Sequence, residues 1–315
     1  MTTIAVTGGA GYVGRELVRQ LVAAHPDAAL HVIDNLDCGE HRLEAMALDK
    51  FTLHRVDIRD RDAVRAAMAS IAPDIVYHLA AVHFIPFCER DPGDAVARNV
   101  AGTVNLLDAV PQGTRFVFAS TAAVYGPEDT AHVEDTSPIR PMDIYGWTKL
   151  QGEQFVRYYH EAGKVSGAIV RLFNVVGSGE TNPHLAPAII EQLDGGNTRV
   201  KLGNLFPHRD YIDVSDAAEG FRRIDAARSA DGTLTLSNLG TGHSHAVGDM
   251  VRSIAEAAGI AIEIEQDESR VRAVDRPMLK ASTAKLEALT GWRPQIPLIE
   301  AMRKAWATRK EDRLQ

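Results

Sequence analysis

A tyrosine and a lysine four residues apart, Tyr145 and Lys149, are well suited in type and spacing to acid–base chemistry. On a helix, residues four apart share one face, so the lysine ammonium can approach the phenol and favour its ionised form. A phenol with an ordinary pKa of about 10 is a poor base at neutral pH without such a cation. Because such pairs also occur by chance on surface helices, the interpretation needs support from the rest of the chain.

Hydroxyl groups lie upstream of this pair, where Ser120 and Thr121 follow the apolar segment 116–119. This segment is typical of a buried parallel strand, and open α/β sheets bind their ligands at the carboxyl ends of such strands. Thr121 could therefore hydrogen-bond a reacting hydroxyl and assist proton transfer. The alternative is that Thr121 only caps the end of the strand.

A glycine-rich loop near the N-terminus points to a dinucleotide. Gly8, Gly11 and Gly14 lie between an apolar run and a helical pattern. Glycines here permit a tight turn, close approach of backbone N–H groups to a pyrophosphate and close helix–strand packing. About 20 positions later, Asp34 ends the next apolar run, where a carboxylate can accept hydrogen bonds from the adenosine ribose.

The charge of Asp34 also bears on which dinucleotide binds. A carboxylate at this position repels the extra phosphate of NADP, so the sequence favours NAD. Asp57 and Ile58 follow the third predicted strand and could flank the adenine. The alternative for Asp57 is a cap for the helix predicted over 60–71, and the sequence does not decide between the two.

The elements that must position these residues alternate between strand and helix, which predicts right-handed crossovers and a doubly wound parallel α/β sheet of the Rossmann type. A second, smaller mixed α/β lobe should follow. We expect a dinucleotide-binding domain over 1–173, a lobe over 174–315 and a segment near 210–242 that returns to the first domain. The expected strands are 4–7, 30–33, 51–56, 75–79, 115–120, 167–173 and 233–239, and the expected helices are 11–24, 60–71, 94–110, 144–162, 185–193 and 215–227.

Composition excludes several classes of protein. The net charge of -8 argues against general affinity for nucleic acid or anionic membranes. The two cysteines, Cys38 and Cys88, lack the spacing of a metal site and predict reduced thiols. His243 and His245 have no third ligand spaced nearby, so no metal is expected. No apolar run long enough to span a membrane and no basic, apolar leader appears, which predicts a cytoplasmic protein.

These motifs occur in an order that resembles one family. The sequence runs from the glycine loop and Asp34 through His78–Ala81, Asn99–Thr103 and Ser120–Gly126 to the Tyr/Lys pair and Arg171–Gly177. This order is similar to that of the extended short-chain dehydrogenases/reductases, the nucleotide-sugar epimerase/dehydratase family, over nearly the whole chain.

The resemblance implies specific roles. Thr121 would be the hydroxyl partner of the substrate, Tyr145 the acid/base and Lys149 the residue that binds the nicotinamide ribose. The NAD would contact Gly8, Gly11, Tyr12, Val13, Gly14, Asp34, Asn35, Asp57, Ile58, Leu79, Ala80, Ala81, Asn99, Tyr145, Lys149 and Phe173. The substrate would contact His83, Thr121, Ala122, Tyr145, Asn174, Val200, Arg209 and Arg276. The helices over 94–110 and 144–162 would form a homodimer interface, although core packing would leave the same pattern.

Three of these substrate contacts have a physical rationale, and each has an alternative. Arg209 and Arg276 could clamp a diphosphate, because guanidinium matches phosphate oxygens with two parallel hydrogen bonds. Each could instead form an ion pair. His83 could bond the sugar or relay a proton, or could simply pack beside Phe84.

Three functions remain open from the sequence. The family's 4,6-dehydratases carry Asp-Glu after the catalytic Thr, whereas this chain has Ala122 and Ala123, which leaves no acid there to expel water. The main expectation is an NAD-dependent 4-epimerase of a UDP- or GDP-hexose. The alternatives are an NAD(P)H-dependent reductase of a nucleotide-4-ketosugar, of the GDP-4-keto-6-deoxyhexose type, and a non-catalytic NAD-sensing scaffold.

Overall fold

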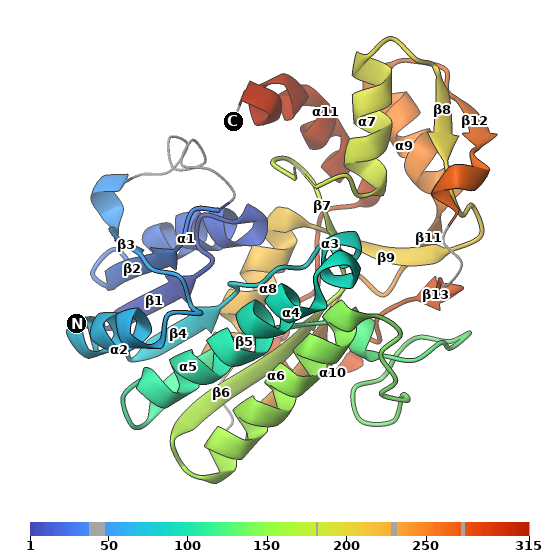
Figure 1. Ribbon diagram of the computed structural model, residues 1–315. Helices are drawn as coiled ribbons and strands as arrows, with labels where there is room; N and C mark the ends of the chain where they lie inside the picture. The colour runs from blue at the N-terminus through green and yellow to red at the C-terminus, as the bar shows by residue number, and fades with distance from the viewer. Residues whose placement is uncertain (38–47, 181, 228–231, 272–274, 315) are drawn as a thin grey trace.

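The computed structural model describes residues 1–37, 48–180, 182–227, 232–271 and 275–314 (Figure 1). Its centre is a seven-stranded sheet in the order β10-β6-β5-β4-β1-β2-β3, in which every neighbouring pair is parallel. The strands are β1 (Thr3–Thr7), β2 (Ala29–Asp34), β3 (Thr52–Arg55), β4 (Ile75–His78), β5 (Thr114–Thr121), β6 (Val165–Leu172) and β10 (Thr235–Leu239). The predicted doubly wound sheet is confirmed, including the late strand that returns to it.

Helices cover both faces of this sheet (Figure 1). The apolar sides of α1 (Tyr12–Ala24) and α8 (Val214–Ala226) are buried on one face, with Leu17 and Phe221 fully buried. On the other face, α2 (Arg61–Ile71), α5 (Gly102–Ala109) and α6 (Ile144–Glu161) enclose a second core around Phe116 and Phe118. The strand order reverses between β1 and β4, which is the place where open α/β sheets bind ligands.

The single helix expected over 94–110 is divided into three parts. It comprises α4 (Pro92–Val96), a π-helical turn (Ala97–Ala101) and α5. The helix is tightly packed at Gly102, where a Cβ atom would lie 2.6 Å from the Ile58 side chain. Hydrophobic periodicity does not distinguish a π turn from an α turn, so the sequence missed it; such turns are frequent at functional sites.

A smaller lobe lies beyond the carboxyl edge of the sheet (Figure 1, upper right). It has its own core, in which Ile189, Met250 and Met302 are fully buried. Its elements include β7 (Asn174–Val176), α7 (Leu185–Asp194), β8 (Arg199–Leu202), β9 (His208–Asp213), β11 (Ser244–Ala246), α9 (Val247–Ala258), β12 (Glu263–Gln266), β13 (Met278–Leu279) and α11 (Leu298–Leu314), with α10 (Ala284–Thr290) on the sheet domain. A division into domains at residue 173 stays a prediction.

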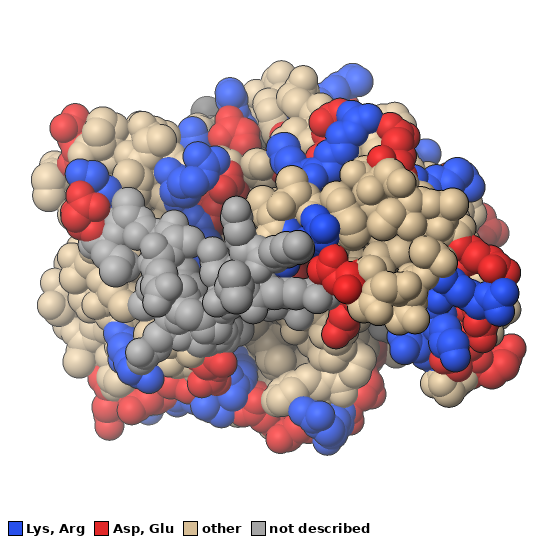
Figure 2. Space-filling model, turned by 90° about the horizontal axis from the view of Figure 1, so that it is seen from above, with Lys and Arg blue, Asp and Glu red and all other residues tan. Residues whose placement is uncertain are grey.

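The surface carries both signs of charge. Seen from above, acidic and basic side chains are interspersed over the visible described residues (Figure 2). No helix among the described residues is both long and apolar enough to cross a membrane.

Candidate active site

A cavity of about 1310 Å³ lies between the carboxyl edge of the sheet and the lobe. This exceeds the volume of a typical small-molecule pocket, so a dinucleotide and a second ligand fit together. Nearly all residues predicted to bind cofactor or substrate line it. They are Gly8, Gly11, Tyr12, Val13, Gly14, Asp34, Asn35, Asp57, Ile58, Leu79, Ala80, Ala81, His83, Thr121, Ala122, Tyr145, Lys149, Phe173, Asn174, Arg209 and Arg276.

The glycine loop forms a close cradle of backbone. Gly8 has a φ of +71°, and a Cβ atom there would lie 2.6 Å from the backbone nitrogen of Ala80 at the end of β4. A Cβ atom on Gly14 would lie 2.0 Å from the carbonyl oxygen of Gly8. The first turn of α1 therefore approaches β1 as closely as backbone allows, and its N-terminus faces the cavity, as an anionic pyrophosphate requires.

The carboxylate of Asp34 is held in place at the end of β2. It accepts hydrogen bonds from the backbone N–H of Ala10 at 3.0 Å and of Leu36 at 2.8 Å. The cradle and this acidic group at the next strand fit NAD, the cofactor expected from the sequence.

The capping alternative for Asp57 is wrong. The cap of α2 is Asp60, whose carboxylate accepts from the backbone N–H of Asp62 and Ala63. Asp57 instead pairs with Arg59, which lowers the pKa of the Asp57 carboxyl far below its ordinary value. Asp57 also lines the cavity, and its predicted contact with the adenine stays a prediction.

The start of α6 brings the acid/base candidate to the end of β5. Asp143 caps the helix by accepting from the backbone N–H of Gly146 at 2.7 Å. A Cβ atom on Gly146 would lie 2.5 Å from the carbonyl oxygen of Ala123, so the helix starts directly against the loop that follows Thr121. The Thr121 hydroxyl accepts a hydrogen bond from the backbone N–H of Ala123 at 3.1 Å, so it caps the turn that follows β5. It also lies close enough to the Tyr145 phenol to lower the pKa of that phenol in part. Its contact with a reacting hydroxyl stays a prediction.

Burial controls the ionisation of Tyr145 and Lys149. It raises the pKa of Tyr145 well above its ordinary value, and the nearby Thr121 hydroxyl offsets only part of this effect. Burial also lowers the pKa of Lys149 to about 7. The ammonium lies over the Phe118 ring, 4.8 Å from its centroid. Desolvation therefore dominates the pKa of both groups, and the predicted stabilisation of the phenolate by Lys149 stays a prediction.

A buried polar network, which the sequence did not reveal, supports Thr121 from behind. Glu153 on α6 accepts from Ser120 at 2.6 Å and from two nitrogens of Arg171 on β6, at 2.9 and 2.8 Å. Arg171 also donates to the Tyr125 hydroxyl at 3.0 Å, and that hydroxyl donates to the Asn238 side chain at 2.7 Å. The network joins α6 to β5 through Ser120, to β6 through Arg171 and to β10 through Asn238.

Two arginines predicted as phosphate clamps line the cavity, and both are engaged in ion pairs. Arg209 pairs with Asp275. Arg276 pairs with Asp143 at 3.1 Å and donates to the carbonyl oxygens of Ala123 and Tyr125, so it braces the loop after β5 and the cap of α6. The contact of either arginine with a diphosphate stays a prediction.

Two predicted site residues do not line the cavity. Val200 is fully buried in the core of the lobe because it lies on the inward face of β8, whereas Lys201 on the opposite face lines the cavity. Asn99 is also buried and contacts the loop after β4 and α6 instead of the cavity. Its side chain accepts from the backbone N–H of Val82 and donates to the Val82 carbonyl and to Thr148.

Three further side chains meet at the lobe side of the cavity. The ligand-type atoms of His83, Glu180 and His184 lie within 4.8 Å of one another. The sequence predicted only His83 as a site residue, because the other two come from the loop before α7 and carry no recognisable motif. The rings of Phe84 and His184 pack in an edge-to-face arrangement, with 5.5 Å between their centroids.

The glycine cradle, the fixed Asp34 carboxylate and the Thr121, Tyr145 and Lys149 constellation together define an NAD-dependent enzyme of the extended short-chain dehydrogenase/reductase class. Comparison with known proteins narrows this class. Residues 4–240 match the model of the NAD dependent epimerase/dehydratase family. The chain belongs to this family.

Individual relatives agree with this assignment. The chain is 31% identical to a UDP-glucose 4-epimerase of Halalkalibacterium halodurans, with 98% of this chain and 96% of that protein covered. It is 27% identical to a GDP-6-deoxy-D-mannose reductase of Pseudomonas aeruginosa, with 95% and 94% covered. Among solved structures, a UDP-glucose-4-epimerase from Stenotrophomonas maltophila with bound NAD and formylated UDP-arabinopyranose is 26% identical with a TM-score of 0.88 and full coverage of both chains. These findings support the epimerase expectation over the reductase alternative.

Proposed function

We propose that the protein is an NAD-dependent 4-epimerase of a UDP-hexose. The observation that carries this proposal is the placement of Thr121, Tyr145 and Lys149 at the carboxyl edge of the sheet, with apolar Ala122 and Ala123 where a dehydratase needs acids. The UDP-glucose 4-epimerases among the relatives favour uridine over guanosine. Bound NAD would accept a hydride from carbon 4 of the sugar and return it to the opposite face of the ketone.

The chain's own residues manage the proton and the geometry. Tyr145 would take the proton of the 4-hydroxyl, with the Thr121 hydroxyl nearby, and later give it back. Lys149 would bind the nicotinamide ribose and supply positive charge near the phenol. Because burial raises the pKa of the phenol, proton removal needs that charge together with the positive charge of the oxidised cofactor.

The substrate would lie in the cavity between the carboxyl edge of the sheet and the lobe. Asn174 and Arg209 line the cavity and would contact the diphosphate, and Arg209 would then exchange Asp275 for phosphate oxygens. His83, Glu180 and His184 line it from the lobe side and would contact the sugar. Closure of the cavity around the sugar would exclude water from the ketone.

We further propose a homodimer formed through α6 and the helical segment 94–110. Large apolar side chains on this face are exposed, among them Trp147 at 49%, Tyr158 at 65% and Val96 at 44%. Exposed apolar side chains gathered on neighbouring helices mark an interaction surface. A cytoplasmic location is part of the proposal, in line with the free, buried Cys88 thiol.

The test measures released nucleotide and product mass. The purified protein is denatured, and the supernatant is analysed by mass spectrometry for NAD. Fresh protein without added cofactor is then incubated with UDP- and GDP-hexoses. We expect NAD in the supernatant and a UDP-hexose isomer of unchanged mass; consumption of NADH or NADPH with a ketosugar only would favour the reductase instead.

A matched pair of variants tests the assigned acid/base. Tyr145→Phe should abolish isomer formation while the protein keeps its NAD. Tyr158→Phe on the same helix, whose side chain is 65% exposed, should be fully active. Activity in the Tyr145 variant would refute the mechanism.

A further inference from the structure

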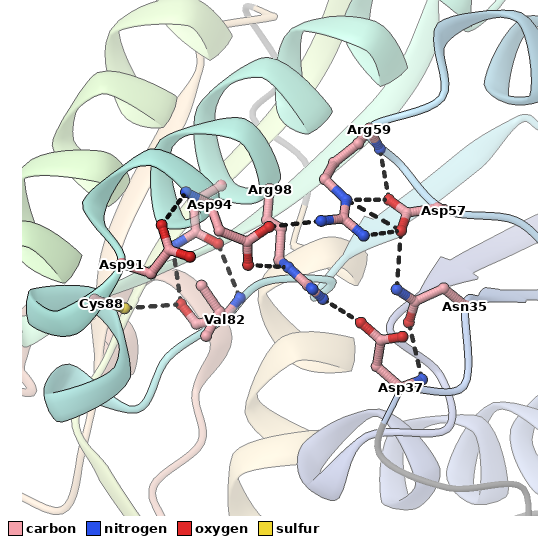
Figure 3. A network of polar contacts seen from close by, with 10 residues as sticks. Asn35, Asp37, Asp57, Arg59, Val82, Cys88, Asp91, Asp94 and Arg98 are labelled. Atoms are coloured by element: carbon pink, nitrogen blue, oxygen red, sulfur yellow. Dashed lines mark hydrogen bonds and ion pairs between the residues drawn. The ribbon is translucent and has the colours of Figure 1, made fainter.

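Six residues form a closed cycle of polar contacts at the end of the cavity next to Asp34 (Figure 3). They come from the loop after β2, the loop between β3 and α2, α4 and the π turn. In cyclic order they are Asn35, Asp57, Arg59, Asp94, Arg98 and Asp37. We call this set the polar cycle.

One half of the polar cycle centres on Arg59. Its Nη2 lies 2.6 Å from Asp57, and its Nη1 lies 2.5 Å from Asp94. Asp57 accepts in addition from the Asn35 side-chain amide at 3.1 Å. Arg59 thus joins the loop after β3 to α4, and through Asp57 to the loop after β2.

The other half centres on Arg98 of the π turn. Its Nε donates to Asp94 at 2.6 Å and its Nη1 to Asp37. The backbone N–H of Asp37 donates to the Asn35 side-chain oxygen at 3.1 Å, which closes the cycle. Arg98 therefore ties Asp37, in the loop after β2, to the π turn and α4 (Figure 3).

Four of the six residues, Asn35, Asp37, Asp57 and Arg98, line the cavity itself. They surround the place where the adenosine half of NAD must lie, because Asp34 is positioned for its ribose. A single exposed ion pair contributes little. Here, however, each guanidinium spans two carboxylates, and the Arg98 side chain is only 24% exposed, so the contacts support one another.

We propose that the polar cycle retains NAD, with Arg98 as the positioning residue that holds Asn35 and Asp37 against the adenosine. The biological purpose rests on the proposed function. An epimerase ends each turnover with its cofactor in the starting oxidation state, so slow cofactor exchange does not lower its turnover rate. A reductase, in contrast, must exchange cofactor in every turnover.

The experiment measures NAD release in the absence of any sugar. NAD-loaded protein is mixed with excess NADH, and the gain in bound NADH fluorescence gives the release rate. We expect Arg98→Ala and Asp37→Asn to raise the release rate about tenfold, which corresponds to about 1.4 kcal/mol. Arg98→Lys should give an intermediate rate, because one ammonium cannot span both carboxylates in the same geometry.

Salt and a matched control separate retention from general stability. Release from the unmodified protein should accelerate with ionic strength, whereas release from Arg98→Ala should respond less, because the partly exposed ion pairs are already gone. Arg65→Ala removes a surface ion pair to Asp108 outside the polar cycle, at 3.0 Å, and should leave release unchanged.

Unchanged release rates in Arg98→Ala and Asp37→Asn, or an equal acceleration in Arg65→Ala, would overturn the inference. The outcome is independent of the epimerase assay. Faster NAD release in a protein that isomerises no hexose would leave this inference standing while the proposed function failed.

Discussion

Replacing Glu153 with glutamine should strongly destabilise the protein, because Glu153 is the buried anion of the network below Thr121. Its side chain is 1% exposed and that of Arg171 is 3% exposed. Glutamine keeps the shape and one acceptor oxygen but removes the charge, so the Arg171 guanidinium would remain buried without its counter-ion. Breaking a buried pair from one side typically costs about 3–5 kcal/mol.

This free energy translates into a measurable melting shift. Unfolding entropy of about 2.1 cal/mol/K per residue gives about 0.7 kcal/mol per degree for a chain of 315 residues. A loss of about 4 kcal/mol therefore lowers Tm by about 6 °C. Differential scanning calorimetry of the unmodified protein and Glu153→Gln, both saturated with NAD, measures this shift.

A double-mutant cycle tests the cause. Arg171→Met alone leaves the Glu153 carboxylate buried without its partner, whereas the double variant leaves no unpaired charge. We expect the double variant to lose clearly less stability than the sum of the two single variants. A Tm decrease below about 2 °C for Glu153→Gln, or strict additivity, would refute the assignment of an energetically important buried pair.

Three further predictions follow from the site. Between pH 7 and 9, the free energy of unfolding of the cofactor-free protein should rise by about 2 kcal/mol more than that of Lys149→Met. The pKa of Lys149 is about 7 in the folded state and about 10.4 in the unfolded state. The unfolded state therefore binds more protons in this window, so raising the pH favours the folded state. Urea unfolding at both pH values measures this, and equal slopes would contradict it. Gly14→Ala should release NAD during purification, because its Cβ atom would lie 2.0 Å from the Gly8 carbonyl; full NAD content by absorbance would argue against the cradle. Trp147→Glu should convert the proposed dimer to a monomer in light scattering, whereas Phe206→Glu, exposed at 58% in the lobe, should not.

Much of the sheet domain could be predicted because its signals are local. Apolar runs and helical periodicity identified β1 to β6, and even β10, within a few residues. The glycine loop and Asp34 predicted the cofactor site because the glycines are required by the local backbone turn between β1 and α1, and Asp34 ends the next strand along the chain. Tyr145 and Lys149 shared a helical face, and that face points into the cavity.

The lobe was harder to predict because its elements are short and its contacts are distant in sequence. Val200 was misassigned because a motif match indicates a segment and not the face of the strand that the side chain occupies. Glu153 lies four residues beyond Lys149, yet nothing in the sequence shows that the folded chain brings Arg171 into an ion pair with it. Likewise, Arg98 acquires its partner Asp37 only when β2 and the π turn are brought to one side of the sheet.

The sheet order has a consequence for synthesis of the chain. The edge strand β10 is made of Thr235–Leu239, yet it pairs with β6, which ends at Leu172. While the ribosome adds the intervening residues, β6 presents an unpaired edge with a buried-type sequence. Such an edge can pair with another chain. A fragment that stops near residue 173 would keep this edge open permanently, so we expect nascent or truncated chains to be prone to aggregation until β10 has emerged.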